Sequence, residues 1–210
     1  MILEIFPSGP LQTNAYLIGC SKTKRAAIID APLGSSEALL KSIKRHALHM
    51  QMLLLTHSHW DHIADAAVLK EKTNAPLYVH EKDAENIKNP GSDRLPLFFS
   101  LSGVQPDGYL TDGQIIELGE LSLHVIHTPG HSPGGVSFYL PQQETLFSGD
   151  TLFSGSIGSL SLPTAHADEM WSSLKKLAAL PKKTKVYPGH GGATTIEKES
   201  WIADAEQRYS

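Results

Sequence analysis

The chain has little cysteine, little arginine and no long apolar run, and each shortage excludes a class of protein. Cys20 is the only cysteine among 210 residues, so no disulfide can form within the chain. No apolar stretch approaches the roughly 20 residues needed to cross a bilayer. The first residues, MILEIFPSGP, lack the basic and apolar regions of a signal peptide. We therefore expect a cytoplasmic protein with no membrane partner.

Positive charge is scarce as well. The formal net charge is -4 with a pI near 6.2, and the only arginines are Arg25, Arg45, Arg94 and Arg208. A groove for nucleic acid normally needs a concentrated basic surface, which this composition does not supply. We expect a small-molecule substrate and no nucleic-acid partner, and the sequence leaves the oligomeric state open.

What the chain does contain is typical of one globular domain. Hydrophobic residues make up 40% and charged residues 19% of the sequence, and no repeat or linker divides it. We therefore expect a single domain over residues 1–210.

The apolar pattern alternates between short strands and helices in both halves. The first half predicts strands at 2–6, 14–19, 26–30, 50–56 and 75–80, and helices at 35–48, 61–73 and 81–88. The second half predicts two strands within 114–128 around a tight turn at 118–120, further strands at 134–140, 144–153 and 185–188, and helices at 167–180 and 195–209. This order favours a sandwich of sheets covered by helices. Residues 89–108 form a long predicted loop, either a wall of a substrate pocket or an ordinary surface connection.

The stretch LLLTHSHWDHIAD, residues 53–65, crowds metal-binding groups behind an apolar strand. His57 and His59 are two apart, so an extended backbone points both imidazoles to the same side. Asp61 and His62 follow where a helix begins, and the positive helix end favours the carboxylate there. Solvated histidines at a helix start would explain one or two of these four residues. The spacing H-x-H-x-D-H indicates a metal site instead.

Three more residues of the same kind stand just after predicted strands. His131 lies in HTPGHSPGG, Asp150 in LFSGDTLF and His190 in VYPGHGG. Loops at strand ends are the usual place for active-site groups on a rigid scaffold. Each residue alone fits a turn or a cap. With the first cluster they total five imidazoles and two carboxylates, enough for two ions that share one ligand.

These motifs closely resemble the metallo-β-lactamase superfamily. The matching residues are THSHWDH at 56–62, His131 in TPGHSPG, Asp150 in SGD and His190 in PGH. The resemblance implies an α/β protein with an αβ/βα four-layer sandwich, in which helices flank two mixed sheets. It also implies one ion held by His57, His59 and His131, and a second ion held by Asp61, His62 and His190. Asp150 would bridge the two ions.

Within the superfamily the motifs are most similar to those of the glyoxalase II (hydroxyacylglutathione hydrolase) branch, in its short form. Full-length members carry a C-terminal helical extension, whereas this chain has twenty residues after His190. Members also carry Gly-Arg and an acidic residue soon after SGDTLF, where this chain has GSIGSLSLP. The resemblance therefore implies the metal site more firmly than it implies the thiol carrier of the substrate.

The implied activity is metal-dependent hydrolysis of a small thioester, such as a hydroxyacylglutathione. Two divalent ions about 3.5–4 Å apart can hold a bridging hydroxide and polarise the carbonyl that it attacks. Asp61 would orient that hydroxide. A donor set of nitrogen and oxygen suits zinc, with iron or manganese as alternatives.

Other activities remain alternatives at this point. A persulfide dioxygenase resembles this branch but uses a single iron, and the missing Arg-acid pair argues mildly against it. A β-lactamase fits the fold, but the missing export signal disfavours it. An RNA-processing nuclease would need the basic surface that is absent. A binding module would not need seven ligands.

Overall fold

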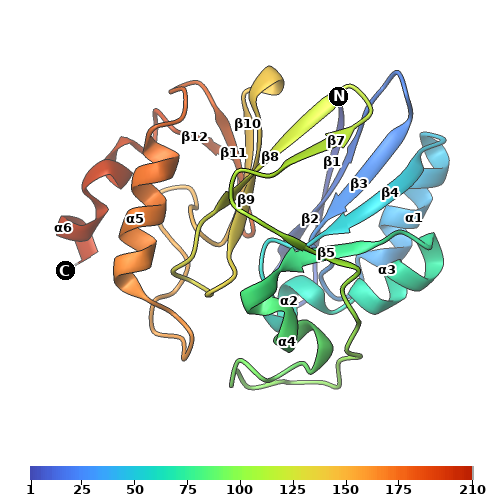
Figure 1. The fold of residues 1–210 in the computed structure, drawn as a ribbon, viewed down its shortest axis with the longest axis horizontal. Helices are drawn as coiled ribbons and strands as arrows, with labels where there is room; N and C mark the ends of the chain where they lie inside the picture. Colours follow the sequence, from blue (N-terminus) through green and yellow to red (C-terminus); the bar gives the residue numbers. More distant parts are fainter. Residues whose placement is uncertain (210) are drawn as a thin grey trace.

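The computed structural model describes residues 1–209 and contains two six-stranded mixed sheets that pack face to face (Figure 1). The first sheet has the order β1-β2-β3-β4-β5-β6, and the second has the order β12-β11-β10-β9-β8-β7. Helices cover the outer face of each sheet (Figure 1). The expected four-layer arrangement with two mixed sheets is confirmed.

The first half of the chain builds the first sheet and its helices. Its elements are β1 Ile2–Ser8, β2 Thr13–Gly19, β3 Arg25–Ile29, α1 Ser36–Arg45, β4 His49–Leu54, α2 Trp60–Ile63, α3 Ala66–Thr73, β5 Leu77–His80, η1 Glu81–Asp83, α4 Ala84–Lys88 and β6 Gly108–Leu110. Strands β1 to β3 pair antiparallel, and β3 to β6 pair parallel.

The second half builds the second sheet and the helices of the opposite face. Its elements are β7 Ile115–Leu118, β8 Leu121–His127, β9 Val136–Leu140, η2 Pro141–Gln143, β10 Thr145–Gly149, α5 Ala167–Ala178, β11 Lys185–Pro188, β12 Thr194–Thr195, η3 Ser200–Asp204 and α6 Ala205–Tyr209. The pairings are antiparallel except that between β10 and β11, which is parallel.

Alternation along the strands sorts the apolar side chains into layers. On β2, Tyr16 and Ile18 join the core between the two sheets, whereas Ala15 and Leu17 join the core beneath the first group of helices. Successive residues of a strand point to opposite faces, so a strand that is buried on both faces is apolar throughout. All seven residues of β2 are buried. This strand is therefore a central wall of the sandwich.

Helix α5 shows the amphipathic spacing that the sequence predicted. Met170, Trp171, Leu174 and Leu177 are buried against the second sheet. Acidic residues occupy its first turn and lysines its last turn, which complements the helix dipole. The predicted helix over 167–180 is thus confirmed, with its end before Pro181.

The predicted helix over 61–73 is interrupted. The structure has two helices there, α2 and α3, with a break at residues 64–65. The amide of Asp65 donates to the carbonyl of Ala31, 2.8 Å away, and its carboxylate accepts from the amide of Ser36. These tertiary hydrogen bonds hold the backbone out of one continuous helix.

The predicted closing helix over 195–209 is also only partly right, because helical structure begins at Ser200. The amides of Ile196 and Glu197 donate to carbonyls of Thr184 and Lys182 in the loop before β11. The buried carboxylate of Glu199 is turned inward, where it accepts from the amide of Gly155 at 2.9 Å. These bonds fix residues 196–199 as an irregular segment.

Two backbone hydrogen bonds join the sheets at one edge of the sandwich. The amide of Val136 donates to the carbonyl of Thr56, and the amide of Asn14 donates to the carbonyl of Gly189, each at 2.8 Å. The ends of β4, β10 and β11 therefore meet at this edge. None of the helices within residues 1–209 has the length and apolar character needed to span a bilayer.

Candidate metal centre

The structure brings all seven sequence-predicted ligand residues together at this edge. His57 and His59 follow β4, Asp61 and His62 lie in α2, His131 lies between β8 and β9, Asp150 follows β10, and His190 follows β11. Their donor atoms form overlapping groups in which all atoms lie within 4.8 Å of one another. Such convergence from five chain segments has the geometry of a metal centre.

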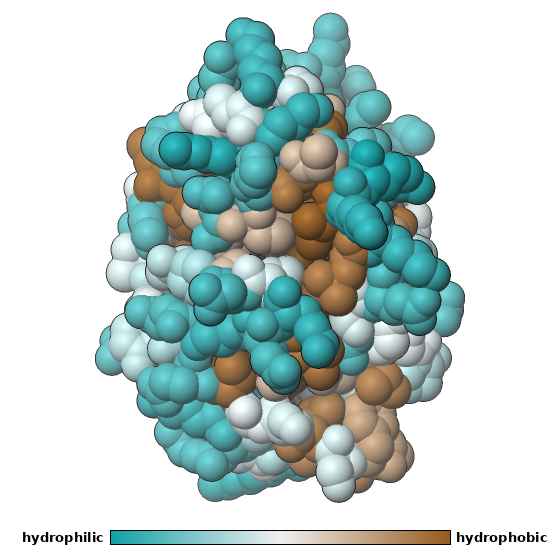
Figure 2. All heavy atoms as spheres, turned by 90° about the vertical axis from the view of Figure 1, so that its right-hand side faces the viewer, coloured by the Kyte–Doolittle hydropathy of each residue, from teal (hydrophilic) through white to brown (hydrophobic). Residues whose placement is uncertain are grey.

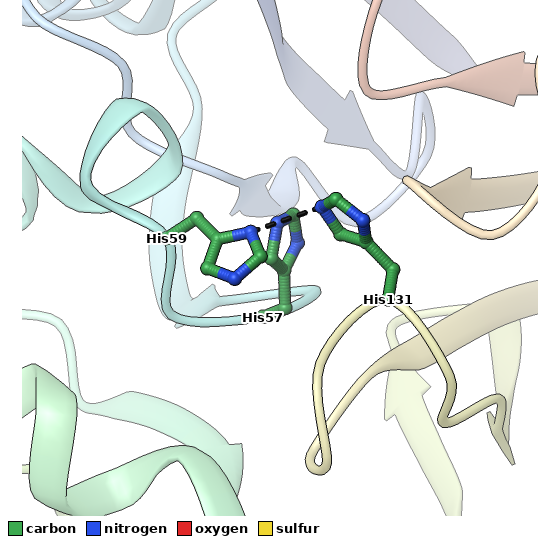
Figure 3. Close-up of side chains that lie close together, drawn as sticks. All are labelled: His57, His59 and His131. Atoms are coloured by element: carbon green, nitrogen blue, oxygen red, sulfur yellow. Dashed lines mark hydrogen bonds between the residues drawn. The ribbon is translucent and has the colours of Figure 1, made fainter. Parts of the chain in front are cut away.

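The first triad consists of His57, His59 and His131 (Figure 3). The imidazoles of His59 and His131 approach from facing loops, and Nδ1 of His59 lies 2.9 Å from Nε2 of His131. The ring centroid of His57 lies 4.6 Å from that of His59 and 5.1 Å from that of His131. All three residues are buried. Three nitrogen donors are thus directed at one small volume.

The second triad consists of Asp61, His62 and His190. Oδ2 of Asp61 lies 3.4 Å from Nε2 of His62 and 3.3 Å from Nε2 of His190. The side chain of His190 is 24% exposed, whereas Asp61 and His62 are buried. This triad therefore combines a carboxylate with two imidazoles and faces solvent through His190.

Asp150 lies between the two triads. Its Oδ2 is 3.4 Å from Nε2 of His131 and 3.4 Å from Nε2 of His190, and its Oδ1 is 3.4 Å from Nε2 of His62. One carboxylate is thus within reach of both groups of donors. This is the position that a bridging ligand requires.

Outer partners fix the tautomers of the imidazoles in both triads. His62 donates from Nδ1 to Oδ2 of Asp30 at 2.9 Å, and Thr56 donates from Oγ1 to the same oxygen. His57 in turn donates from Nδ1 to the Thr56 hydroxyl at 3.0 Å. Nε2 of each ring is therefore the nitrogen that faces the centre. Such outer partners orient ligands and raise their basicity.

The imidazoles of His131 and His190 donate to backbone carbonyls. His131 donates from Nδ1 to the carbonyl of Ser159 at 2.9 Å, and His190 donates from Nδ1 to that of Leu11 at 3.2 Å. The hydroxyl of Thr13 donates to Oδ2 of Asp61 at 2.7 Å.

The sequence analysis missed these outer partners. Asp30 carried a usable signal, because it is a carboxylate directly after an apolar strand, as Asp150 is. The carbonyls of Ser159 and Leu11 carry no signal in the sequence.

Several donor atoms of the centre are buried without a hydrogen-bond partner. They are Nε2 of His57 and His62 and Oδ1 of Asp150. A buried polar atom left unpaired costs about 1–3 kcal/mol, so several at one point need a common explanation. A cation removes the cost at all of them, because each can contribute a lone pair. The residues present therefore fit divalent metal ions.

Burial sets the protonation of the first triad. It lowers the pKa of His57 well below its usual range, and the charge of His62 lowers that pKa further. Burial together with the nearby imidazole of His131 lowers the pKa of His59 to about 3. His57 and His59 are therefore neutral at physiological pH, which is the form that binds a metal.

Neighbouring charges set the protonation of the second triad. Burial opposes protonation of His62, but the carboxylates of Asp61 and Asp150 raise its pKa well above the usual range. Burial likewise opposes protonation of His190, but bonds to Asp150 and Asp61 raise its pKa to about 9. Burial also opposes ionisation of Asp61, yet His62 and His190 hold its pKa at about 2. Without a cation, His62 and His190 hold protons, and the carboxylates of Asp61 and Asp150 beside them are ionised.

The backbone approaches the centre closely at Gly189. A Cβ atom added there would lie 2.0 Å from Oδ1 of Asp150 and 2.7 Å from Cε1 of His62. At Gly192, three residues further along, an added Cβ would meet nothing within 4 Å. The first position thus needs glycine for lack of space, whereas the second does not.

Comparison with known proteins relates this site to one family. A family model described as the metallo-beta-lactamase superfamily matches residues 8–190. Hydroxyacylglutathione hydrolase GloC of Haemophilus influenzae is 34% identical over 95% of this chain and 95% of its own.

Two solved structures share the fold. BLEG-1 B3 metallo-beta-lactamase is 38% identical with a TM-score of 0.86, over 94% of this chain and 96% of its own. TTHA1623 in a di-iron-bound form is 37% identical with a TM-score of 0.81, over the same shares of the two chains.

Proposed function

The chain belongs to the metallo-beta-lactamase superfamily, and on that premise we propose that it is a binuclear hydrolase of small thioesters, such as a hydroxyacylglutathione. The observation that carries the proposal is the pair of triads with Asp150 between them, within 3.4 Å of imidazole nitrogens of both, and with buried donor atoms left unpaired at their centre. Two groups of three ligands with a common carboxylate suit two ions better than one.

The superfamily binds divalent metals, and we propose that each triad holds one ion, with Asp150 as a ligand of both. Every donor is an imidazole nitrogen or a carboxylate oxygen. Such donors suit zinc, and they accept iron or manganese as well. TTHA1623, a relative in structure, is described in a di-iron-bound form, which keeps iron as an alternative to zinc.

Bound ions would lower the pKa of a coordinated water to roughly 7 and polarise the carbonyl that is attacked. The side chains of the protein supply position and charge. Asp61 stays ionised beside His62 and His190, and the hydroxyl of Thr13 fixes the orientation of its carboxylate. We propose that Asp61 orients the attacking water. A thiolate leaves without a general acid, and the proposal assigns none.

A thioester is favoured as the substrate by the relative GloC, which is named a hydroxyacylglutathione hydrolase. The net charge of -4 does not attract a polyanion, so we keep the prediction of a small-molecule substrate and no bound nucleic acid. A cytoplasmic location likewise stays a prediction.

The test combines metal analysis with turnover. Purified protein loaded with zinc, iron or manganese should hold two equivalents and hydrolyse S-lactoylglutathione, and chelation should remove activity that the metal restores. His46→Ala is the matched control, because His46 contacts Glu4 on the surface, away from the centre. The proposal fails if the loaded protein cleaves no thioester.

The same assay separates two other chemistries. One equivalent of iron with oxygen uptake on glutathione persulfide would identify a persulfide dioxygenase, the alternative that the sequence left open. Hydrolysis of a β-lactam faster than of any thioester would identify a lactamase. The latter is the second candidate, because the chain is 38% identical to BLEG-1 B3 metallo-beta-lactamase.

A further inference from the structure

The metal centre meets solvent through one ligand, and apolar side chains border that opening. His190 is the only ligand that is not buried. The aromatic ring of Phe153 lies 5.8 Å from its imidazole, in an edge-to-face arrangement. Leu11, whose carbonyl accepts from His190, has a side chain that is 53% exposed. A molecule that approaches His190 therefore meets apolar groups beside it.

Two further loops place apolar groups around the centre. Leu33 is 39% exposed in the loop between β3 and α1, and this loop bonds to α2 through Ala31. Trp60, between the ligands His59 and Asp61, contacts the rings of Phe98 and Phe99 at 5.7 and 5.5 Å. Phe98 itself is 75% exposed. We call Leu11, Leu33, Trp60, Phe98, Phe99 and Phe153 the apolar rim.

Half of the rim residues are exposed, which few large apolar side chains of this molecule are. Most apolar side chains are buried in three core clusters, yet three of the ten exposed large hydrophobic residues, Leu11, Leu33 and Phe98, belong to the rim. Figure 2 views the molecule from the right-hand side of Figure 1 and shows apolar residues at its lower end, where the loop of residues 89–107 lies in Figure 1. Exposed apolar groups beside a reactive centre mark a binding surface.

Charge around the centre points the same way. The loops that carry the rim and the last ligand span residues 9–12, 30–35, 89–107, 150–166 and 189–193. Arg94 is the only lysine or arginine in these loops, and outside them Lys82 lines a hollow with Ser58 and Ser132. Glutathione carries two carboxylates, which are normally bound by cationic side chains. One arginine is a poor match for that tripeptide, whereas the rim suits an uncharged apolar group.

We propose that the preferred substrate carries an apolar acyl group, aryl or branched alkyl, next to its thioester, and that the apolar rim binds this group. The inference rests on the proposed thioesterase function and narrows its substrate class. The carbonyl would lie at the metal centre near His190, and the acyl chain would cover Phe98 and Leu11. Burying exposed apolar surface on both partners supplies the binding energy.

The first experiment varies the acyl group on one uncharged thiol, N-acetylcysteamine. We expect kcat/KM for the phenylacetyl thioester to exceed that for the acetyl thioester by about tenfold or more. We also expect it to exceed that for S-lactoylglutathione. Equal values for the two acyl groups, or S-lactoylglutathione as the best substrate, would overturn the inference while leaving the thioesterase function intact.

Two variants of the same loop sharpen the result. Phe98→Ala should lower the ratio of phenylacetyl to acetyl kcat/KM by about fivefold to tenfold, because an aromatic contact is lost. Arg94→Ala, four residues earlier in the same loop, should leave that ratio unchanged. If Arg94→Ala instead impairs S-lactoylglutathione hydrolysis more than Phe98→Ala impairs the aryl substrate, the loop recognises charge and the inference is wrong.

A binding measurement keeps the inference testable without turnover. Calorimetry on the metal-loaded protein should show phenylacetate, the acyl product, binding at least about tenfold more tightly than acetate. Equal affinities would refute the role of the rim. Preferential binding of phenylacetate by a protein that cleaves no thioester would refute the proposed function but not the apolar rim.

Discussion

The first and second triads hold the same kind of ring nitrogen in opposite protonation states. His59 in the first triad has a pKa of about 3, whereas His190 in the second has a pKa of about 9. Burial lowers the pKa of both, although His190 is partly exposed and His59 is buried. Bonds to Asp150 and Asp61 outweigh burial at His190. Carboxylate neighbours, together with partial exposure, therefore decide which imidazole holds a proton.

This contrast means that the two triads receive a cation differently. An ion entering the first triad meets neutral His57 and His59 and releases no proton from them. An ion entering the second triad must displace protons from His62 or His190, although the carboxylate of Asp61 attracts it. We therefore expect the two sites to be filled with different affinities and different dependence on pH.

The largest effect should follow from removing the residue that the triads share. Asp150→Ala should lower kcat on a thioester by about a thousandfold or more, because both sites lose a ligand and several kcal/mol of charge stabilisation. Metal content by mass spectrometry should fall below two equivalents, with circular dichroism showing a folded chain. An Asp150→Ala variant with wild-type turnover would show that Asp150 is not a ligand shared by the two triads.

The metal affinities of the two triads should depend differently on pH. Because His190 is protonated below a pH of about 9, the affinity of the second triad should rise about tenfold per pH unit from 6 to 9 for each proton displaced, and then level off. His57 and His59 stay neutral over this range, so the first triad should change much less. Titration of cobalt into metal-free protein, followed by absorbance, measures both. Identical slopes would contradict the assignment.

The outer partner of His62 should have a smaller effect. Asp30→Asn weakens the bond that holds the tautomer of His62 and should lower metal affinity at the second triad by about 10- to 100-fold. Asp65→Asn is the matched control, because Asp65 is also buried near α2 but bonds to the amide of Ser36 instead. Competition with a chromophoric chelator measures the affinities. A loss as large in Asp65→Asn would indicate a general loss of structure.

The smallest effect is expected at Thr13. Thr13→Val removes one hydrogen bond to Asp61 and should lower kcat about threefold to tenfold, with both metal ions retained, because a single hydrogen bond contributes about 0.5–1.5 kcal/mol. Thr13→Ser keeps the hydroxyl and should restore the rate. Failure of the serine variant to do so would show that the methyl group, and not the bond, matters.

The seven residues of the candidate metal centre could be singled out from the sequence because each one stands beside a strong local signal. Asp150 and His190 follow apolar strands and stand next to glycine, so the pattern of residues alone indicates their place at a sheet edge. Short apolar runs and helical spacing likewise predicted the strand at 14–19 and the helix at 167–180. These patterns repeat within a few residues, and local periodicity is what a sequence displays directly.

The parts that could not be predicted depend on contacts between distant segments. The break between α2 and α3 follows from a bond between Asp65 and Ala31, and the irregular turn before η3 follows from Glu199 and the loop before β11. The tautomers of His131 and His190 are set by carbonyls of Ser159 and Leu11. Every residue has a backbone carbonyl, so the residue type does not indicate which carbonyl accepts the hydrogen bond.

The tight approach of the backbone at Gly189 limits how this centre can be redesigned. Any side chain at that position would collide with the carboxylate of Asp150, so substitutions of Gly189 would disrupt the centre. Gly192 lies in the same loop, with open space around it and no positive φ. New side chains intended to reach a substrate from this loop are therefore best introduced at residue 192, where they leave the metal centre unchanged.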